Sequence, residues 1–204
     1  GDALANRLKE DGVILGSPRT NALTSLAVVS ICDSQPSYQF YRTRTAERQI
    51  SVNLLDTAIK ESMTIFHIGS LSLIEGDDAG FWENKFSGLA SDGVITSLDP
   101  NVRPVAVRDK ASYISRLNRM FEHACVLKLS DEDLYYIIPE MTEDDAFDQL
   151  CTKTRAKLVI LTKGADGAVI RTKNQQFKIK AILARPLKDT VGAGDTFMGT
   201  ILAE

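Results

Sequence analysis

The sequence predicts an α/β fold built on a mainly parallel sheet, and three observations support this prediction. Four short apolar runs recur along the middle of the chain, and most are apolar on both faces, as expected for strands covered by helices on each side. Segments with the 3.6-residue spacing of amphipathic helices separate these runs. A glycine-rich turn near the end leads directly into an apolar helix. This alternation is typical of a parallel sheet with right-handed crossovers.

The predicted strands and helices follow one another in a regular order. The strands are expected at residues 64–68, 94–98, 125–129 and 158–162. Residues 77–90 and 109–124 are expected to be helical, because their large apolar side chains fall on one stripe. Ser130 is a suitable N-cap, and the three acids after it suit the positive end of a helix dipole, so a further helix should begin there.

Two stretches interrupt the alternation and predict hairpins. Residues 24–31 and 38–42 are strand-like and are joined by the short polar turn 32–37, which has no room for a crossover helix. They predict a β-hairpin outside the main sheet, forming a small lid around residues 22–44 of a single domain over residues 1–204. Residues 168–172 and 177–182 predict a second hairpin.

Composition narrows the class of protein. The 204 residues carry a net charge of −3 with 44% hydrophobic and 25% charged residues, which indicates a globular chain and excludes a disordered charged tail. The near-neutral charge argues against nucleic-acid binding, and no apolar run approaches a membrane span of about 20 residues. Three separated cysteines without a CxxC pair predict buried thiols in a reducing, cytoplasmic setting. The first residue is Gly1 and the last lies inside a predicted helix, so we expect a fragment cut at both ends.

Residues 189–197, DTVGAGDTF, are the most informative segment. Gly192 and Gly194 precede a helix, so unpaired N–H groups and the positive dipole end should face an anion such as a transferring phosphoryl group. Asp195 on the first turn is placed to accept a proton from an attacking hydroxyl. Taken alone, GAGD is equally compatible with an ordinary glycine turn. A dinucleotide fingerprint and a Walker A loop fit poorly, because neither GxGxxG nor Gly-Lys-Ser/Thr is present.

The whole segment resembles the second signature of the ribokinase-like (PfkB) carbohydrate kinases. Residues 97–104, SLDPNVRP, resemble the DxNxR segment of that family, and residues 161–168, LTKGADGA, resemble its nucleotide-bordering glycine turn. The stretches 40–46 and 67–70 look like the fructokinase and 2-keto-3-deoxygluconate kinase branch. The resemblance implies a ribokinase-like three-layer α/β/α fold with a mainly parallel sheet and a small β lid.

The resemblance also implies roles at the glycine-rich segment. Asp195 would be the catalytic base, and the amides of Gly192, Ala193 and Gly194 would form an anion hole around the transferring phosphate. Asp189 and the carbonyl of Val191 match positions that hold a monovalent cation, usually potassium, in many members.

Further roles come from the other matched segments. Arg103 and Asn101 would lie between sugar and phosphates, Tyr41 and Arg42 would reach the sugar from the lid, and Gly164 and Gly167 would border the nucleotide. The family's Asn-x-x-Glu motif, associated with magnesium and phosphate, is here Ser130 and Asp133, which alters the reach of both oxygen ligands. Arg42 as a solvated edge charge and Arg103 as a turn residue paired with a surface acid remain open alternatives.

The resulting hypothesis is an ATP-dependent sugar kinase that uses Mg²⁺, and in some members K⁺, to phosphorylate a primary hydroxyl, with fructose as the expected acceptor. A 2-keto-3-deoxygluconate kinase and a non-catalytic sugar- or nucleotide-binding fragment of the same fold are the alternatives. The expected ligands are a small sugar and ATP, with no nucleic acid or membrane partner. Pairing of two copies through the lid remains open.

Overall fold

The computed structural model describes residues 1–17, 19–32, 35–50, 52, 63–182 and 190–204. The chain forms two compact units, one made of residues 1–63 and 76–78 and the other of residues 64–75 and 79–204. The single domain with a lid around residues 22–44 stays a prediction. Within the described ranges, no helix combines the length and apolarity needed to cross a bilayer.

The first unit contains the predicted hairpin. Helix α1 (Asp2–Glu10) precedes the strands β1 (Leu26–Cys32) and β2 (Gln35–Tyr41), which pair antiparallel as a separate two-stranded sheet. The hairpin is confirmed, but its predicted turn was too long. Pairing continues to Cys32 opposite Gln35, and β2 includes Pro36, which a strand of a two-stranded ribbon accepts because one of its edges needs no N–H donor.

The second unit is built on a six-stranded sheet of order β3-β4-β5-β6-β7-β8. The first four strands are parallel, and β7 and β8 continue the sheet as an antiparallel hairpin. The four predicted parallel strands are confirmed to within one residue at each end, and so is the second hairpin, although β8 ends three residues early. The bounds are Ile65–Gly69, Ile95–Asp99, Val126–Ser130, Leu158–Thr162, Ala168–Thr172 and Gln176–Ile179.

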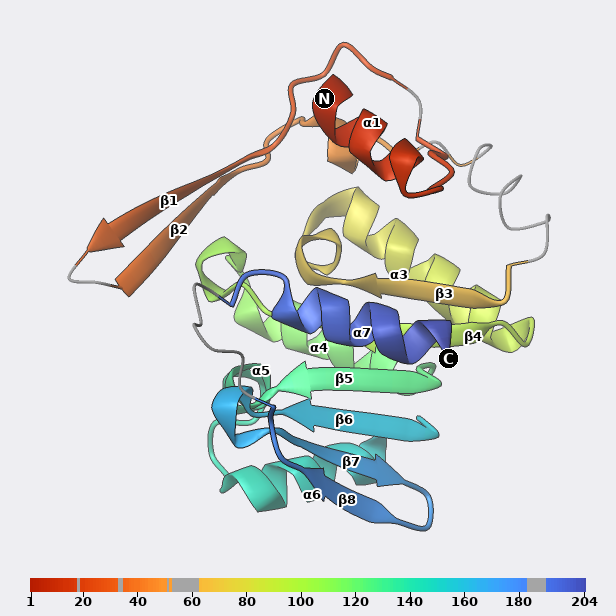
Figure 1. The fold of residues 1–204 in the computed structure, drawn as a ribbon, viewed down its shortest axis with the longest axis vertical. Helices are drawn as coiled ribbons and strands as arrows, with labels where there is room; N and C mark the ends of the chain where they lie inside the picture. Colours follow the sequence, from red (N-terminus) through yellow and green to blue (C-terminus); the bar gives the residue numbers. More distant parts are fainter. Residues whose placement is uncertain (18, 33–34, 51, 53–62, 183–189) are drawn as a thin grey trace. The chain divides into compact units, whose positions relative to one another are not determined.

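Helices cover both faces of this sheet, as Figure 1 shows. Helix α7 lies on one face, and α4 and α6 lie on the other. The helices are α3 (Gly76–Ser91), α4 (Lys110–Phe121), α5 (Asp131–Ile137), α6 (Glu143–Lys153) and α7 (Ala193–Ala203). Single 3₁₀ turns follow three of the strands or their loops, at Ser70–Leu73, Pro104–Ala106 and Gly164–Asp166.

The face toward α3 and α4 is apolar. Strand residues alternate between faces, so Phe66, Leu98 and Leu127 point to the same side, where all three are buried. The ring of Phe66 lies 6.3 Å from that of Phe86 in α3, which is fully buried. The stripes predicted for the two helices therefore form the core on this side of the sheet.

The face toward α7 is polar near the carboxyl ends of the strands. Register places His67 beside Ser97 on that face, and the next residue of β4 on the same side is Asp99. The His67 ring and the Ser97 hydroxyl are 3.0 Å apart. Lys128 of β5 joins this group through an ion pair with Asp99. The two faces of the sheet thus differ in their contacts: apolar packing dominates one face, and polar contacts gather on the other.

A cluster of charges fastens α3 to α4. Glu83 accepts hydrogen bonds from Arg116 at 3.1 Å and from Arg119 at 2.5 Å. Arg116 also donates to the carbonyls of Leu73 and Ile74, at 2.9 and 3.0 Å. Burial alone would raise the pKa of Glu83, but the two guanidinium groups outweigh it and the pKa lies below its usual 4.5.

We expect Glu83→Gln to lower the free energy of unfolding by about 2 kcal/mol at pH 7, because charge-assisted hydrogen bonds are lost. A carboxylate whose pKa is lowered by folding stabilises the fold above its unfolded pKa and loses that contribution as the pH falls through the folded value. The difference between wild type and variant should therefore shrink between pH 7 and pH 3. Urea unfolding across this range, with exposed Glu140→Gln as the control, checks it; a constant difference would contradict the ion-pair explanation.

Candidate active site

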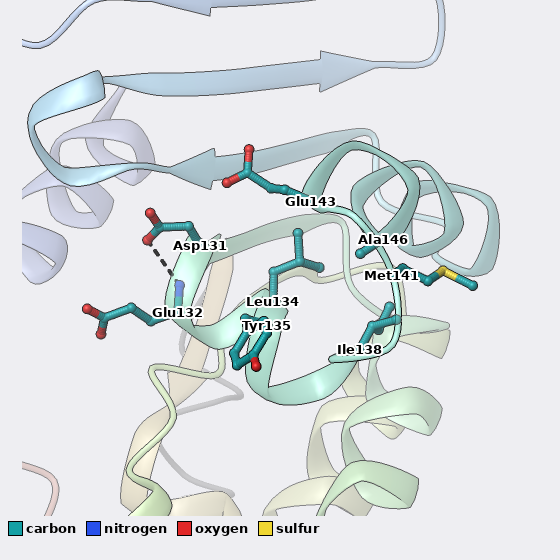
Figure 2. A pocket seen from close by; sticks show the side chains of 8 residues that line it. All are labelled: Asp131, Glu132, Leu134, Tyr135, Ile138, Met141, Glu143 and Ala146. Carbon is teal, nitrogen blue, oxygen red and sulfur yellow. Dashed lines mark hydrogen bonds between the residues drawn. The ribbon is translucent and has the colours of Figure 1, made fainter.

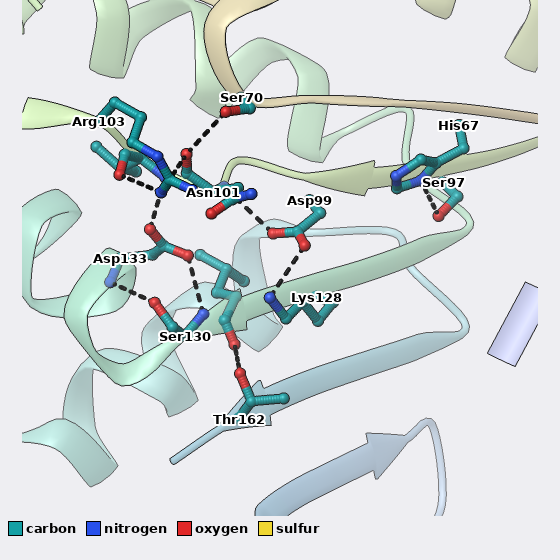
Figure 3. Close-up of polar contacts among 12 residues, drawn as sticks. His67, Ser70, Ser97, Asp99, Asn101, Arg103, Lys128, Ser130, Asp133 and Thr162 are labelled. Carbon is teal, nitrogen blue, oxygen red and sulfur yellow. Dashed lines mark hydrogen bonds and ion pairs between the residues drawn. The ribbon is translucent and has the colours of Figure 1, made fainter. Parts of the chain in front are cut away.

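The loop after β4 is held in a tight, partly strained turn. The Asp99 carboxylate accepts a hydrogen bond from the Asn101 N–H at 3.2 Å, and Asn101 has a φ of 39°. Asparagine is one of the few residues that adopts this left-handed region at low cost. The Ser70 N–H donates to the Pro100 carbonyl at 3.0 Å, and the Ser70 hydroxyl donates to the Asn101 carbonyl (Figure 3). Two hydrogen bonds from Ser70 thus join residues 67–70 to the DxNxR segment.

Asp133 attaches the same loop to helix α5. Its carboxylate accepts the Val102 N–H at 2.7 Å and the Ser130 N–H at 3.0 Å. The Ser130 hydroxyl accepts the Asp133 N–H at 3.0 Å, which completes a capping box at the predicted helix start. Asp133 is buried. Each oxygen of this carboxylate accepts one backbone N–H, so the side chain joins the loop after β4 to the start of α5.

Arg103 folds back on its own loop. Its guanidinium donates to the carbonyls of Asn101 and Val102, at 3.2 and 3.1 Å (Figure 3). These contacts are with the backbone, whereas the alternative prediction for Arg103 was pairing with a surface acid. Its other donors have no partner among the described residues, so they can bind the paired oxygens of an anion.

Lys128 and Asp99 form a buried ion pair at the carboxyl end of the sheet. The Lys128 Nζ lies 3.0 Å from the Asp99 Oδ2, and each residue is only 4% exposed. Burial raises the pKa of the Asp99 carboxyl, and the neighbouring ammonium opposes this effect. Lys128 was not among the residues predicted for the site. The available signal was a lysine in the middle of an otherwise apolar strand, since lysine is almost never fully buried unless it is paired.

The glycine-rich segment forms the start of α7 as predicted. Gly192 is the N-cap residue, with a φ of 77°, and the Thr196 N–H donates to its carbonyl at 2.8 Å. The Ala193 N–H donates to the Thr190 carbonyl at 3.2 Å, so it belongs to the turn. Within the described part of the chain, the N–H groups of Gly192 and Gly194 have no acceptor. These two amides are the donors that an incoming anion would meet.

Asp195 lies on the first turn of α7 and is exposed. It is close enough to the polar face for its charge to act on His67, together with those of Asp99 and Lys128. Burial lowers the pKa of His67, while the carboxylates of Asp99 and Asp195 oppose that shift. The structure therefore brings together, in one unit, Asp195, the α7 amides and the loop that carries Arg103.

The second glycine turn links β6 to β7. Gly164 and Gly167 both have positive φ values, of 50° and 94°, and the Lys163 N–H donates to the Gly167 carbonyl at 2.8 Å. The Lys163 ammonium lies 2.6 Å from the Glu143 carboxylate of α6. A hydrogen bond and an ion pair of Lys163 thus hold this turn at the end of the sheet. Its role beside the nucleotide stays a prediction.

The two lid residues belong to the first unit. Arg42 pairs with Glu47 at 3.1 Å and its side chain is only 10% exposed, so it is not a solvated edge charge. Tyr41 is 56% exposed, and its hydroxyl donates to Gln39 at 3.2 Å. Of the two proposed cation ligands, Asp189 lies outside the described residues, and Val191 has an exposed side chain.

A separate pocket lies between α5 and α6, with a volume of about 330 Å³ (Figure 2). An exposed aromatic ring, Tyr135, and apolar side chains of both helices form most of its wall, with carboxylates at its rim. It contains none of the predicted site residues. The lining residues are Asp131, Glu132, Leu134, Tyr135, Ile138, Met141, Glu143 and Ala146.

Comparison with known proteins bears directly on this geometry. The family model of the pfkB family carbohydrate kinases matches residues 1–204. The chain belongs to this family. It is 35% identical to a fructokinase from Rhizobium leguminosarum bv. trifolii over 207 aligned positions, which cover the whole chain and 61% of that protein.

Solved structures of family members share the fold. A fructokinase from Xylella fastidiosa with bound ATP matches with a TM-score of 0.86 and 30% identity, over 98% of this chain and 63% of that one. A putative ribokinase II from E. coli matches with a TM-score of 0.83 and 25% identity, over 100% and 65% of the two chains. The ribokinase-like fold is thereby confirmed. The chain spans about three fifths of the length of these relatives.

Asp133→Ala should lower the free energy of unfolding by about 3 kcal/mol. The change removes a helix cap and leaves the N–H groups of Val102 and Ser130 without their acceptor. Asp131→Ala on the same turn is the matched control and should cost less than about 1 kcal/mol, because its carboxylate bonds only to the adjacent Glu132 N–H. Urea unfolding of both variants checks this, and equal losses would contradict the role given to Asp133.

Proposed function

We propose that this chain carries the phosphoryl-transfer site of an ATP-dependent sugar kinase that phosphorylates a primary hydroxyl of fructose. The observation that supports this most is the start of α7, where an exposed carboxylate lies beside two amides that have no acceptor among the described residues. The fructokinases among the relatives support fructose as the acceptor. The ATP bound in the Xylella fructokinase supports ATP as the donor.

In the proposed mechanism, Asp195 accepts the proton of the sugar hydroxyl as that oxygen attacks the γ-phosphorus. The bond from the γ-phosphorus to the bridging oxygen breaks, and ADP leaves with that oxygen. Asp195 is suited to this step because it is exposed on the first turn of α7. From this position its side chain can reach a hydroxyl that approaches the amides at the start of α7.

The amides of Gly192 and Gly194 stabilise the charge that builds on the transferring phosphoryl group. They are preorganised, because the turn fixes their direction before the substrate arrives. Ala193 contributes through the turn, since its N–H already bonds to Thr190. Arg103 and Asn101 would hold the phosphates, and the planar guanidinium of Arg103 suits paired oxygens.

The remaining predicted residues complete this proposal. Tyr41 and Arg42 are the proposed sugar-binding residues of the lid, and Gly164 and Gly167 the proposed nucleotide-bordering ones. Mg²⁺ would enter with the phosphates of ATP and neutralise their charge. Ser130 and Asp133 would act on it only through water, since their side chains are committed to the capping box. Asp189 and the Val191 carbonyl are the proposed K⁺ ligands.

Asp195→Asn should lower kcat by about 10²–10⁴-fold and change the KM values for ATP and fructose by less than about threefold. The amide keeps the size of the side chain but cannot take the proton. Steady-state kinetics on the full-length protein with Mg-ATP checks this, with Asp92→Asn, an exposed aspartate after α3, as the control. A variant that keeps its kcat would exclude Asp195 as the base.

The acceptor is tested with a panel of fructose, 2-keto-3-deoxygluconate and ribose, at equal concentrations and with Mg-ATP. We expect the highest kcat/KM with fructose. Turnover with the keto acid alone would keep the mechanism and replace the substrate. No turnover with any of the three, while ATP still binds, would contradict the catalytic proposal.

A further inference from the structure

We propose that Lys128 is a positioning residue for phosphoryl transfer, whose buried ammonium holds the N-terminal turn of α7 against the loop after β4. This inference rests on the proposed function. It assigns to a strand residue outside the matched motifs the task of fixing the distance between the two segments that would surround the phosphates.

The charge of Lys128 lies in the interior of the second unit, within strand β5. Lys128 is the middle residue of β5, between Leu127 and Leu129, which are both fully buried, and is itself 4% exposed. Taking an ammonium and a carboxylate out of water costs several kcal/mol per ion before their attraction is counted. An apolar side chain would pack at this position without that cost. The pair with Asp99 is therefore a poor stabiliser, and its presence calls for another role.

The Lys128 ammonium also lies close to the first turn of α7. A Cβ atom built on Gly194 would lie 3.2 Å from the Lys128 Nζ, closer than nine in ten such contacts in proteins. The ammonium thus lies directly against the backbone of the helix turn, on the side toward the sheet. A side chain at position 194 would therefore require the ammonium or the helix turn to shift by a few tenths of an ångström.

Through Asp99, Lys128 also connects this turn to the loop after β4. Its partner Asp99 also accepts the Asn101 N–H, which holds Asn101 at its left-handed φ and so sets the course of the chain toward Arg103. Figure 3 shows Lys128 and Asp99 together at the base of this loop. Loss of the ammonium would leave a buried carboxylate without its counter-charge and an empty space under Gly194, so both sides of the site would shift.

Lys128→Met keeps the length of the side chain and removes its charge. We expect kcat to fall by about 10–100-fold in the full-length protein, with the KM for fructose changed by less than about threefold, because small misplacements of the reacting groups affect the transition state most. Lys157→Met, an exposed lysine just before β6, is the matched control and should leave both constants unchanged. Unchanged kcat in Lys128→Met would overturn the proposal.

A purely structural role is separated by removing both charges. Asp99→Asn with Lys128→Met should fold well even if Lys128→Met alone does not, because replacing a whole buried pair is far less costly than breaking it. The asparagine can still accept the Asn101 N–H. If Lys128 serves only to balance Asp99, this double variant recovers the wild-type kcat, and the positioning role is overturned. If it positions α7, kcat stays low.

The contact with Gly194 is tested by a double-mutant cycle. Gly194→Ala places a methyl group 3.2 Å from the ammonium, so its effect on kcat should depend on whether the lysine is present. We expect the combined loss in Gly194→Ala with Lys128→Met to be at least about fivefold smaller than the product of the single losses. Losses that simply multiply would contradict the contact on which the proposal depends.

Binding of ADP with aluminium fluoride, a mimic of the transferring phosphoryl group, gives a readout that does not need turnover. Lys128→Met should weaken this binding by about tenfold and the binding of ADP alone by less than about twofold. If the wild type shows no kinase activity but this difference appears, the proposed function fails and the positioning role stands. If the wild type binds the mimic no more tightly than ADP, or the variant binds it equally well, the role of Lys128 is overturned.

Discussion

The ion pair between Lys128 and Asp99 is the contact on which the polar half of this molecule depends. It lies where two parallel strands end, at 3.0 Å and nearly out of contact with water. From Asp99 the contacts run to Asn101, and a second carboxylate, that of Asp133, holds Val102. The loop after β4 is therefore fixed from both sides by buried acids, and only one of these has a cationic partner among the described residues. Such fully bonded buried polar groups rigidify a site, because any displacement leaves a charge or donor unpaired.

The sheet tolerates buried charges on one face because its other face supplies the apolar core. The face toward α3 and α4 supplies the apolar core, with Phe86, Leu117 and Phe121 fully buried. The face toward α7 can then hold charged groups near the carboxyl ends of the strands, where open α/β sheets generally bind their ligands. The position of the site is thus a consequence of topology. Parallel strands bring their carboxyl ends to one edge, and the loops that follow them meet there.

Much of this could be predicted from the sequence, for definable reasons. The four parallel strands are buried apolar runs, and their period and length identify them to within one residue. The start of α5 was predicted because Ser130 and the acids after it form a local signal that needs no tertiary context. The turn of the first hairpin was wrong, because pairing up to Cys32 and Gln35 depends on register rather than on the polarity of residues 32–37. A lysine inside an apolar strand indicated a paired ammonium at Lys128, but its partner is 29 positions away and no local pattern identifies that partner.

The motifs predicted which residues belong to the site, and the structure shows which hydrogen bonds those residues already make. Asp133 illustrates the difference. The family resemblance predicted that it acts near the phosphates and magnesium, yet both of its oxygens bond to the backbone and hold the loop that carries Arg103. In the proposed kinase its effect on nucleotide binding would therefore be exerted through that loop.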